Sequence, residues 1–190
     1  MAHFGAPSKL ASLGQALAYR NSQILHKFVE HYDVSLAQSR ELFTETKKWL
    51  WLNAQPDAPR MVVTREMIII DEMWHTFVLF TDCYHRYCLR NFGRFLHHRP
   101  TTKREKDRAA AQRKRDPEGF RRRRLAALAT QYEFICDRLG PETAIKWYAE
   151  FPQRYDRRFF ERARRAPDLP DASPATRRRL AKLVDAHAER

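Results

Sequence analysis

Four titratable side chains of the segment 68–90 share one side of that segment if it is helical. At ~100° per residue they form a narrow polar stripe, made of Asp71, His75, Asp82 and His85. Residues three or four apart are neighbours on a helix surface. Asp71 and His75 can therefore direct a carboxylate and an imidazole to one point, and Asp82 and His85 can do the same.

This combination of side chains is the ligand chemistry of transition metals. Two histidines and one carboxylate bind zinc or non-haem iron and leave coordination positions open for water or substrate. A pair of adjacent histidines follows the segment. We therefore predict an iron or zinc site with these ligands: Asp71, His75, His97 or His98, and in reserve Asp82 and His85.

The stripe has two other interpretations. Asp71 could orient His75 for general acid–base chemistry without a metal. Alternatively, the stripe is the polar side of an amphipathic helix and faces water. The sequence leaves open whether the chain is an enzyme.

The stripe is expected to lie on a central helix, 65–91, which Thr64 caps at its N-terminus. If this helix is unbroken, His75 lies ~24 Å from its C-terminal end at 1.5 Å per residue. The next six residues span at most ~20 Å, so His97 barely returns to His75, and the reserve ligands are nearer. If the helix breaks at Thr81, whose hydroxyl can cap a following turn, the histidine pair reaches His75. Both arrangements remain open.

Three further residues of the central helix are expected to surround the site as core. Trp74, Tyr84 and Cys88 fall on its apolar side at ~100° per residue. The indole N–H of Trp74 needs a hydrogen-bond acceptor, which Asp71 could offer. Cys88 shares its side with no evident base, which indicates a buried thiol rather than a nucleophile.

The residues around the stripe also resemble a known family. The likeness covers about residues 60–100 and rests on Asp71, Trp74, His75, Thr76, Tyr84, Cys88, Gly93 and the run His97-His98-Arg99-Pro100. These residues resemble the motif of the glycine-rich-domain-protein-like family, of which the chain looks like a bacterial member. Members outside bacteria carry a second histidine and a proline where this chain has Phe77 and Thr81. The resemblance implies a focus at Asp71, His75 and the histidine pair, and no particular activity.

Apolar residues recur at helical spacing along the rest of the chain. They predict a first helix from a Ser8 cap to about Tyr32, and a second from a Ser35 cap to a proline-containing loop at 53–59. Three more helices are expected after the central one, at 117–139, 141–151 and 152–165. The fold class is therefore all-α, an irregular bundle of about six to eight helices.

One helical domain is expected over residues 1–165. Within it, 101–116 is a charged, exposed segment, either helical or partly disordered. Residues 166–190 are expected to form a proline-rich linker and a small basic C-terminal helix.

Positive charge is concentrated in one segment of the chain. The net charge is +13, and residues 103–124 hold eleven Lys and Arg residues against four Asp and Glu residues. This segment could bind nucleic acid or an acidic protein, through Lys103, Arg104, Lys106, Arg113, Lys114, Arg115, Arg121, Arg122, Arg123 and Arg124. The alternative function is therefore a basic binding module in which the histidine motif is structural. The segment lacks helix-turn-helix, zinc-finger and interleaved aromatic patterns.

Composition excludes several other classes of protein. Five glycines in 190 residues argue against a Gly-rich phosphate loop. No apolar run approaches the ~20 residues of a membrane span, and the N-terminus lacks the pattern of a secretory signal. Three unpaired cysteines do not build a disulfide framework, so a cytoplasmic protein is expected. A scaffold that docks another protein is a third possibility, which the sequence neither supports nor excludes.

Overall fold

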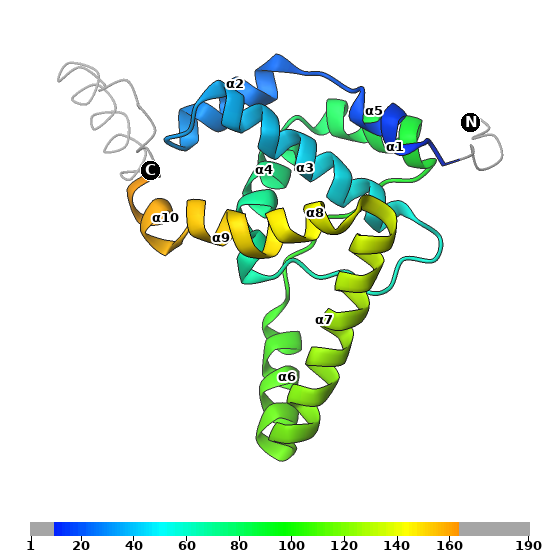
Figure 1. Ribbon diagram of the computed structural model, residues 1–190, viewed down its shortest axis with the longest axis vertical. Coiled ribbons are helices and arrows are strands. Elements are labelled where there is room, and N and C mark those ends of the chain that lie inside the picture. The colour runs from blue at the N-terminus through cyan, green and yellow to red at the C-terminus, as the bar shows by residue number, and fades with distance from the viewer. Residues whose placement is uncertain (1–9, 164–190) are drawn as a thin grey trace, which may run out of the picture.

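The computed structural model describes residues 10–163, in which every regular element is a helix (Figure 1). The first half contains α1 (Leu13–Leu17), α2 (Ser22–His31), α3 (Leu36–Ala54), α4 (Ile68–Leu79) and α5 (Thr81–Phe92). The second half contains α6 (Lys103–Arg115), α7 (Pro117–Leu139), α8 (Pro141–Ile145), α9 (Phe151–Arg154) and α10 (Arg157–Ala163). The predicted all-α fold class is confirmed. The predicted linker and C-terminal helix at 166–190 lie outside the described residues.

The core forms around α3. This helix packs against α1, α2 and α4, and it buries side chains on more than one side, among them Leu42, Trp49 and Leu50. Ser35 caps α3 as predicted, in a capping box with Gln38. Because α3 has neighbours on several sides, its polar residues Glu45 and Lys47 are buried too.

The predicted first helix is wrong as a single element. Within the described residues it is divided into α1 and α2, and each starts at its own N-cap. The Ser12 side chain accepts from the N–H of Gln15, and the Asn21 side chain accepts from the N–H of Gln23. These side-chain bonds satisfy helix N–H groups that would otherwise lack partners, so two short helices replace one long helix.

Of the two arrangements left open for the central helix 65–91, the structure contains the broken one. A 3₁₀ turn, Arg65–Met67, precedes α4, and α4 ends at Leu79. Phe80 has φ −85° and ψ 64°, outside the helical region, and α5 starts at the next residue. Neither predicted hydroxyl cap is formed, because neither the 3₁₀ turn after Thr64 nor α5 at Thr81 has a side-chain cap hydrogen bond.

Contacts across the break explain its geometry. Trp74 on α4 donates its indole N–H to the Tyr84 hydroxyl on α5 at 3.0 Å, and the rings of Phe77 and Tyr84 meet edge to face at 5.1 Å. Both Phe77 and Tyr84 are buried. The break therefore folds α5 back so that its apolar side joins the core.

The helix predicted at 117–139 is present in the C-terminal half as α7. Pro117 is the first residue of α7, and Gly140, with φ 84°, ends it. The two short helices expected at 141–165 are instead α8, a π-helical turn (Lys146–Glu150), α9 and α10. The segment 101–116 is helical as α6, and Figure 1 shows α6 and α7 projecting together from the rest of the molecule. We call this helical hairpin, residues 103–130, the basic arm.

Among the described residues, no helix combines the length and the apolar character that crossing a membrane requires.

Candidate metal centre

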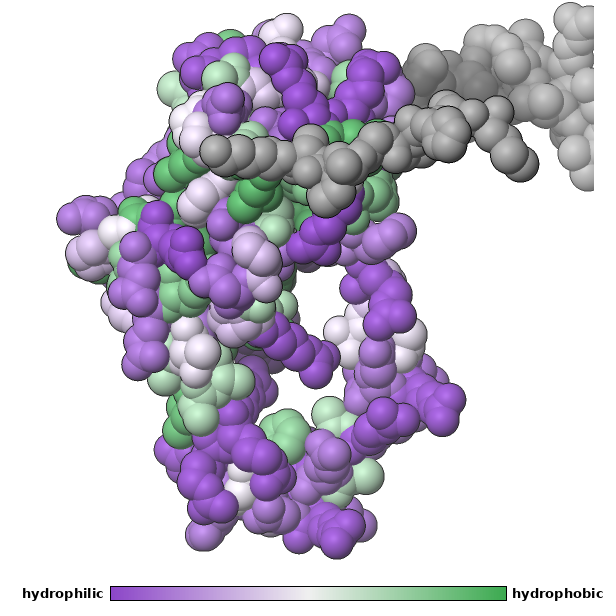
Figure 2. All heavy atoms as spheres, turned by 90° about the vertical axis from the view of Figure 1, so that its right-hand side faces the viewer, coloured by the Kyte–Doolittle hydropathy of each residue, from purple (hydrophilic) through white to green (hydrophobic). Residues whose placement is uncertain are grey.

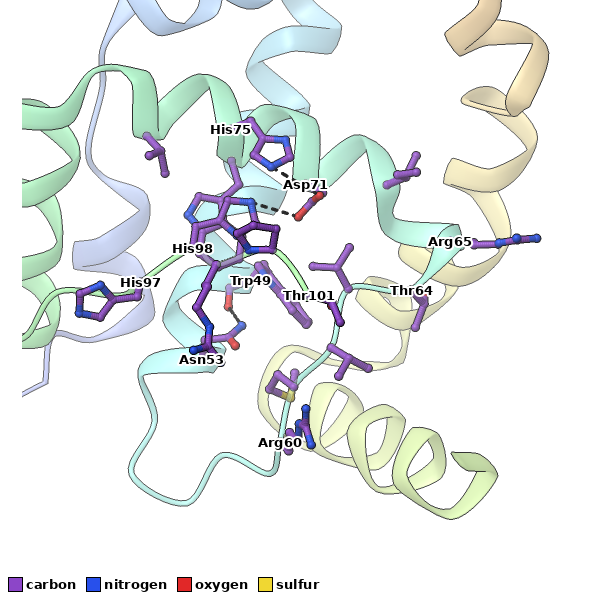
Figure 3. Close-up of a pocket in the computed structure, with 18 residues that line it drawn as sticks. Trp49, Asn53, Arg60, Thr64, Arg65, Asp71, His75, His97, His98 and Thr101 are labelled. Atoms are coloured by element: carbon purple, nitrogen blue, oxygen red, sulfur yellow. Dashed lines mark hydrogen bonds and ion pairs between the residues drawn. The ribbon is translucent and has the colours of Figure 1, made fainter. Parts of the chain in front are cut away.

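Three predicted ligands converge at one point of the structure. Asp71 and His75 lie one turn apart on α4, and His98 comes from the connection between α5 and α6 (Figure 3). One ligand atom from each of these residues lies within 4.8 Å of the other two. Asp71 Oδ2 lies 3.8 Å from His75 Nε2, and Asp71 Oδ1 lies 3.5 Å from His98 Nε2. A carboxylate oxygen and two imidazole nitrogens thus face a common centre.

His98 contacts two aromatic rings. Its imidazole stacks on Trp74 with a centroid separation of 4.0 Å and an interplanar angle of 15°. Its centroid also lies 4.5 Å from that of the His75 ring. These contacts restrict the ring so that Nε2 points toward Asp71.

The Nε2 atom of His98 is buried and has no hydrogen-bond partner within the described residues. The 3.5 Å approach of Asp71 is an ion-pair distance and does not meet the geometry of a hydrogen bond. A buried polar atom without a partner destabilises the folded state by about 1–3 kcal/mol. Such an atom needs an explanation, and a ligand at this nitrogen would supply its missing interaction.

Glu72 supports His75 from the side opposite Asp71. Its Oε2 lies 3.7 Å from His75 Nδ1 and accepts a hydrogen bond of 2.6 Å from the Tyr32 hydroxyl. Both ring nitrogens of His75 therefore face carboxylates, one from Asp71 and one from Glu72. Partners of this kind orient metal-binding histidines in known sites. Glu72 was not among the predicted site residues, although its position three residues before His75 on a helix indicates that the two side chains are neighbours.

A hydrogen-bonded chain positions the segment that carries His98. The Trp74 indole donates to the Tyr84 hydroxyl at 3.0 Å, and that hydroxyl donates to the carbonyl of Leu96 at 2.7 Å. The connection is thereby attached to α4 and α5 two residues before His98. The expected acceptor for Trp74 was Asp71, and the actual acceptor is Tyr84, which leaves Asp71 free to face the histidines.

Burial shifts the titration of two cluster residues. It raises the pKa of the Asp71 carboxyl above its ordinary value, an effect that His75 and His98 partly oppose. Burial also lowers the pKa of the His98 imidazole. The charge of Asp71 opposes this shift, and that of His75 reinforces it. The lowered pKa favours the neutral imidazole of His98, which is the form that binds metals.

A cavity of about 800 Å³ opens beside the cluster (Figure 3). Its wall includes all three converging residues, the loop 60–65 and the segment 97–101. The lining combines apolar side chains with three arginines, Arg60, Arg65 and Arg99. This volume is within the ~300–1,000 Å³ of typical small-molecule sites, so the cluster has room for a ligand beside it.

One hydrogen-bonding residue far along the chain holds the cavity wall. Gln131 on α7 accepts from the backbone N–H of Val62 at 2.8 Å and donates to the Val62 carbonyl at 3.0 Å. It also donates to the Tyr148 hydroxyl at 2.7 Å. Gln131 is completely buried. The sequence offered no sign of this role, because a lone glutamine on a helix is usually solvated.

The structure does not bring every predicted ligand to the cluster. His97 is exposed, its ring meets Phe95 at 4.9 Å, and Figure 3 shows it apart from Asp71 and His75. Asp82 is exposed and pairs with Arg86 at 2.7 Å. His85 is exposed as well and lies 5.8 Å from the Phe95 ring. These three residues therefore lie apart from the converging ligand atoms. Asp82 and His85 belong to α5, which the break at Phe80 separates from α4, and His97 lines the neighbouring cavity without joining the cluster.

The core assignments near the cluster agree with the structure. Trp74, Tyr84 and Cys88 are all buried. Burial raises the pKa of the Cys88 thiol above its ordinary value, which favours the unreactive protonated form.

Comparison with known proteins gives one family match. A family described as UCP032817-like, which is uncharacterised, matches residues 15–138. No curated protein and no solved structure matches the chain. The resemblance to the glycine-rich-domain-protein-like family is therefore wrong. The matched span includes the converging residues and extends from α1 to nearly the end of α7.

Proposed function

For this chain, which belongs to the UCP032817-like family, we propose a metal-binding function centred on Asp71, His75 and His98. The proposed ion is iron or zinc. The observation that carries the proposal is the convergence of three ligand atoms within 4.8 Å, one of which is a buried nitrogen without a partner.

The donor set supports this choice of metals. One carboxylate and two imidazoles are the protein ligands of many non-haem iron centres and of several catalytic zinc sites. Metal–nitrogen bonds of about 2.1 Å place two ligands of one tetrahedral ion about 3.4 Å apart. Ligand atoms that now lie within 4.8 Å of one another therefore need to approach by up to about 1.4 Å, which side-chain rotation can supply.

The cavity beside the cluster favours a catalytic role over a structural one. Structural zinc sites are closed by four protein ligands, whereas catalytic sites keep positions open. Three protein ligands next to about 800 Å³ of space correspond to the open type. A metal bound here would act as a Lewis acid or lower the pKa of a bound water. The proposed enzyme class is a metal-dependent oxidative or hydrolytic enzyme.

The adjacent histidines provide a matched test. We expect purified protein to contain iron or zinc near one equivalent, measured by elemental analysis. His98→Ala and His75→Ala should lose this metal, whereas His97→Ala should retain it, because only His97 lies outside the cluster. Circular dichroism controls for the fold.

Two outcomes would contradict the metal proposal. One is protein from a metal-replete preparation that contains no metal and whose Tm does not change when iron or zinc is added. The other is equal metal content in His97→Ala and His98→Ala.

The basic arm supports a second candidate function, the binding of nucleic acid. Helix α6 has no buried residue, so it contributes no side chain to the core. The ten basic residues predicted as contacts are all exposed, and two of them form ion pairs within the arm, Lys103 with Asp107 and Arg123 with Asp116. Figure 2 shows mostly hydrophilic side chains, with a few hydrophobic ones among them, at the lower end of the molecule, where the arm projects.

A salt titration tests this candidate. The arm variant replaces three exposed cations by glutamine, Arg113, Lys114 and Arg115, and a control variant removes three elsewhere, Arg90, Arg157 and Arg158. If the arm contacts phosphates, the slope of log K against log salt for a random DNA duplex should fall by about 2 to 3 in the arm variant alone. No binding by wild type at 50 mM NaCl would remove this candidate.

A further inference from the structure

Besides the basic arm, a smaller group of cationic side chains lies around Lys47 of α3, away from the metal cluster. Lys47 is 1 % exposed. Its Nζ donates to the carbonyls of Leu17 at 2.8 Å and Tyr19 at 2.9 Å, and it lies 4.9 Å from the Phe43 ring centroid. Within the described residues no carboxylate pairs with it at 4.0 Å or less. Buried lysines are usually paired with a negative charge. The surroundings of Lys47 therefore lack the negative charge that would be expected there.

Arg20 adds a second positive charge at the same place. Its guanidinium donates to the carbonyls of Leu17 and Tyr19, the two acceptors that Lys47 uses. Burial, and secondly the charge of Arg20, lower the pKa of Lys47 to about 8. Two cations thus share two neutral oxygens, and their mutual repulsion is not compensated by an acidic side chain in the described part of the chain.

The space next to these cations is a small cavity of about 180 Å³. Three cationic residues line it, together with polar and apolar ones: Arg20, Arg40 and Lys47, then Asn21, Ser22 and Thr44, and then Leu25 and Phe43. Its lining includes no acidic residue. At ~30 Å³ per water molecule, the volume corresponds to about six waters, which is enough for one phosphate group and part of its hydration shell.

We propose that this cavity is an oxyanion site that binds a phosphate group, either free or as the end of a small phosphate monoester. Guanidinium and ammonium groups form charge-assisted hydrogen bonds with phosphate oxygens. An anion in the cavity would lie among these three cationic residues and supply the missing negative charge. The site is separate from the metal cluster, since the two cavities have no lining residue in common.

The experiment uses inorganic phosphate and phenyl phosphate as probes. Thermal unfolding is followed at constant ionic strength, with chloride as the replaced anion and with a chelator present so that bound metal does not contribute. We expect the Tm of wild type to rise with phosphate and then saturate, as for a ligand that binds the folded state alone. A larger rise with phenyl phosphate would assign the site to a monoester, and an equal rise to free phosphate.

Variants separate this site from general salt effects. Arg40→Gln, at an exposed position, should lose more than half of the phosphate-dependent rise, and Lys47→Met should lose nearly all of it. Arg60→Gln, which removes a cation from the cavity beside the metal cluster, should respond like wild type. A rise that never saturates, or that is equal in wild type and in Arg40→Gln, would overturn the proposal, because phosphate stabilises most proteins weakly by exclusion from their surface.

Discussion

His97 and His98 are neighbours in the chain, yet their side chains have different surroundings. His98 is held by Trp74 and faces Asp71, whereas His97 is exposed. Tyr84 contributes to this difference, because its hydroxyl joins Trp74 to the Leu96 carbonyl. The Tyr84 hydroxyl thus positions His98, a candidate ligand, without contacting it.

We therefore expect Tyr84→Phe to weaken both stability and metal binding. The change leaves the buried Trp74 N–H without its acceptor and the Leu96 carbonyl without its donor, so the free energy of unfolding should fall by about 1–3 kcal/mol. Metal affinity should fall about 10- to 100-fold, as for other supporting residues. Urea unfolding and metal titration measure the two effects. Tyr132→Phe, at a 41 % exposed tyrosine, is the control, and equal behaviour of the two variants would refute the assignment.

Lys47 provides a second prediction at the residue scale. Its pKa is about 8 in the folded protein, because burial and Arg20 disfavour the charged form, and about 10.4 in an unfolded chain. Between these values the unfolded state binds more protons, so stability rises with pH. We expect the free energy of unfolding of wild type, relative to Lys47→Met, to rise by about 3 kcal/mol between pH 7.5 and pH 10.5. The measurement is urea unfolding in chloride buffers, and a pH-independent difference would exclude the lowered pKa.

The candidate site and its cavity are built from helices and connections that lie apart in the sequence. The break at Phe80 separates α4 from α5 and lets the connection after α5 return to α4. Gly93 begins that connection with φ 66°, a conformation that glycine adopts without a Cβ clash. On the opposite side, Gln131 of α7 holds the loop that includes Val62. The cavity is therefore formed by loops that helices position.

Removal of the Gln131 side-chain amide is expected to loosen that wall. Gln131→Leu leaves the N–H and carbonyl of Val62 without their partners, so amide exchange at residues 60–64 should become faster while exchange in α3 stays slow. Hydrogen-exchange mass spectrometry makes this comparison. Thr130→Ala, at an exposed neighbour whose hydroxyl bonds within its own helix, should leave the exchange of the loop unchanged. Slow exchange of the loop in Gln131→Leu would contradict the role given to Gln131.

At the scale of the whole molecule, a net charge of +13 is unevenly distributed between the body and the basic arm. The body contains the core around α3, whereas α6 in the arm buries nothing. Like charges in the arm repel one another, and salt screens this repulsion. The arm can therefore change in charge without disturbing the packing of the body.

We expect the Tm of wild type to rise between 50 and 300 mM NaCl, and to rise less in the arm variant that replaces Arg113, Lys114 and Arg115. Differential scanning calorimetry measures these shifts. In the control variant, in which Arg90, Arg157 and Arg158 are replaced, the rise should be close to that of wild type. An equal rise in the arm variant would show that the charge of the arm does not strain the fold.

Much of the architecture follows from local sequence. Periodic apolar residues, the Ser35 cap, Pro117 at a helix start and Gly140 at a helix end predict elements that the structure contains. The pairing of Asp71 with His75 is also local, because helix geometry alone places residues four apart side by side. The breaks before α2 and at Phe80 were harder to predict from the sequence. A local cap or a backbone rotation favours each break, but tertiary contacts can outweigh or reinforce that local preference.

Long-range packing decided the rest. It selected His98 over His97, Asp82 and His85, gave Trp74 the acceptor Tyr84, and buried Lys47 among other cations. These outcomes depend on which segments meet in space, and contacts between residues distant in sequence carry no local pattern. Helical periods are repeated within a few turns and can be read directly, whereas a site made from α4 and a distant connection exists only once the core around α3 has assembled.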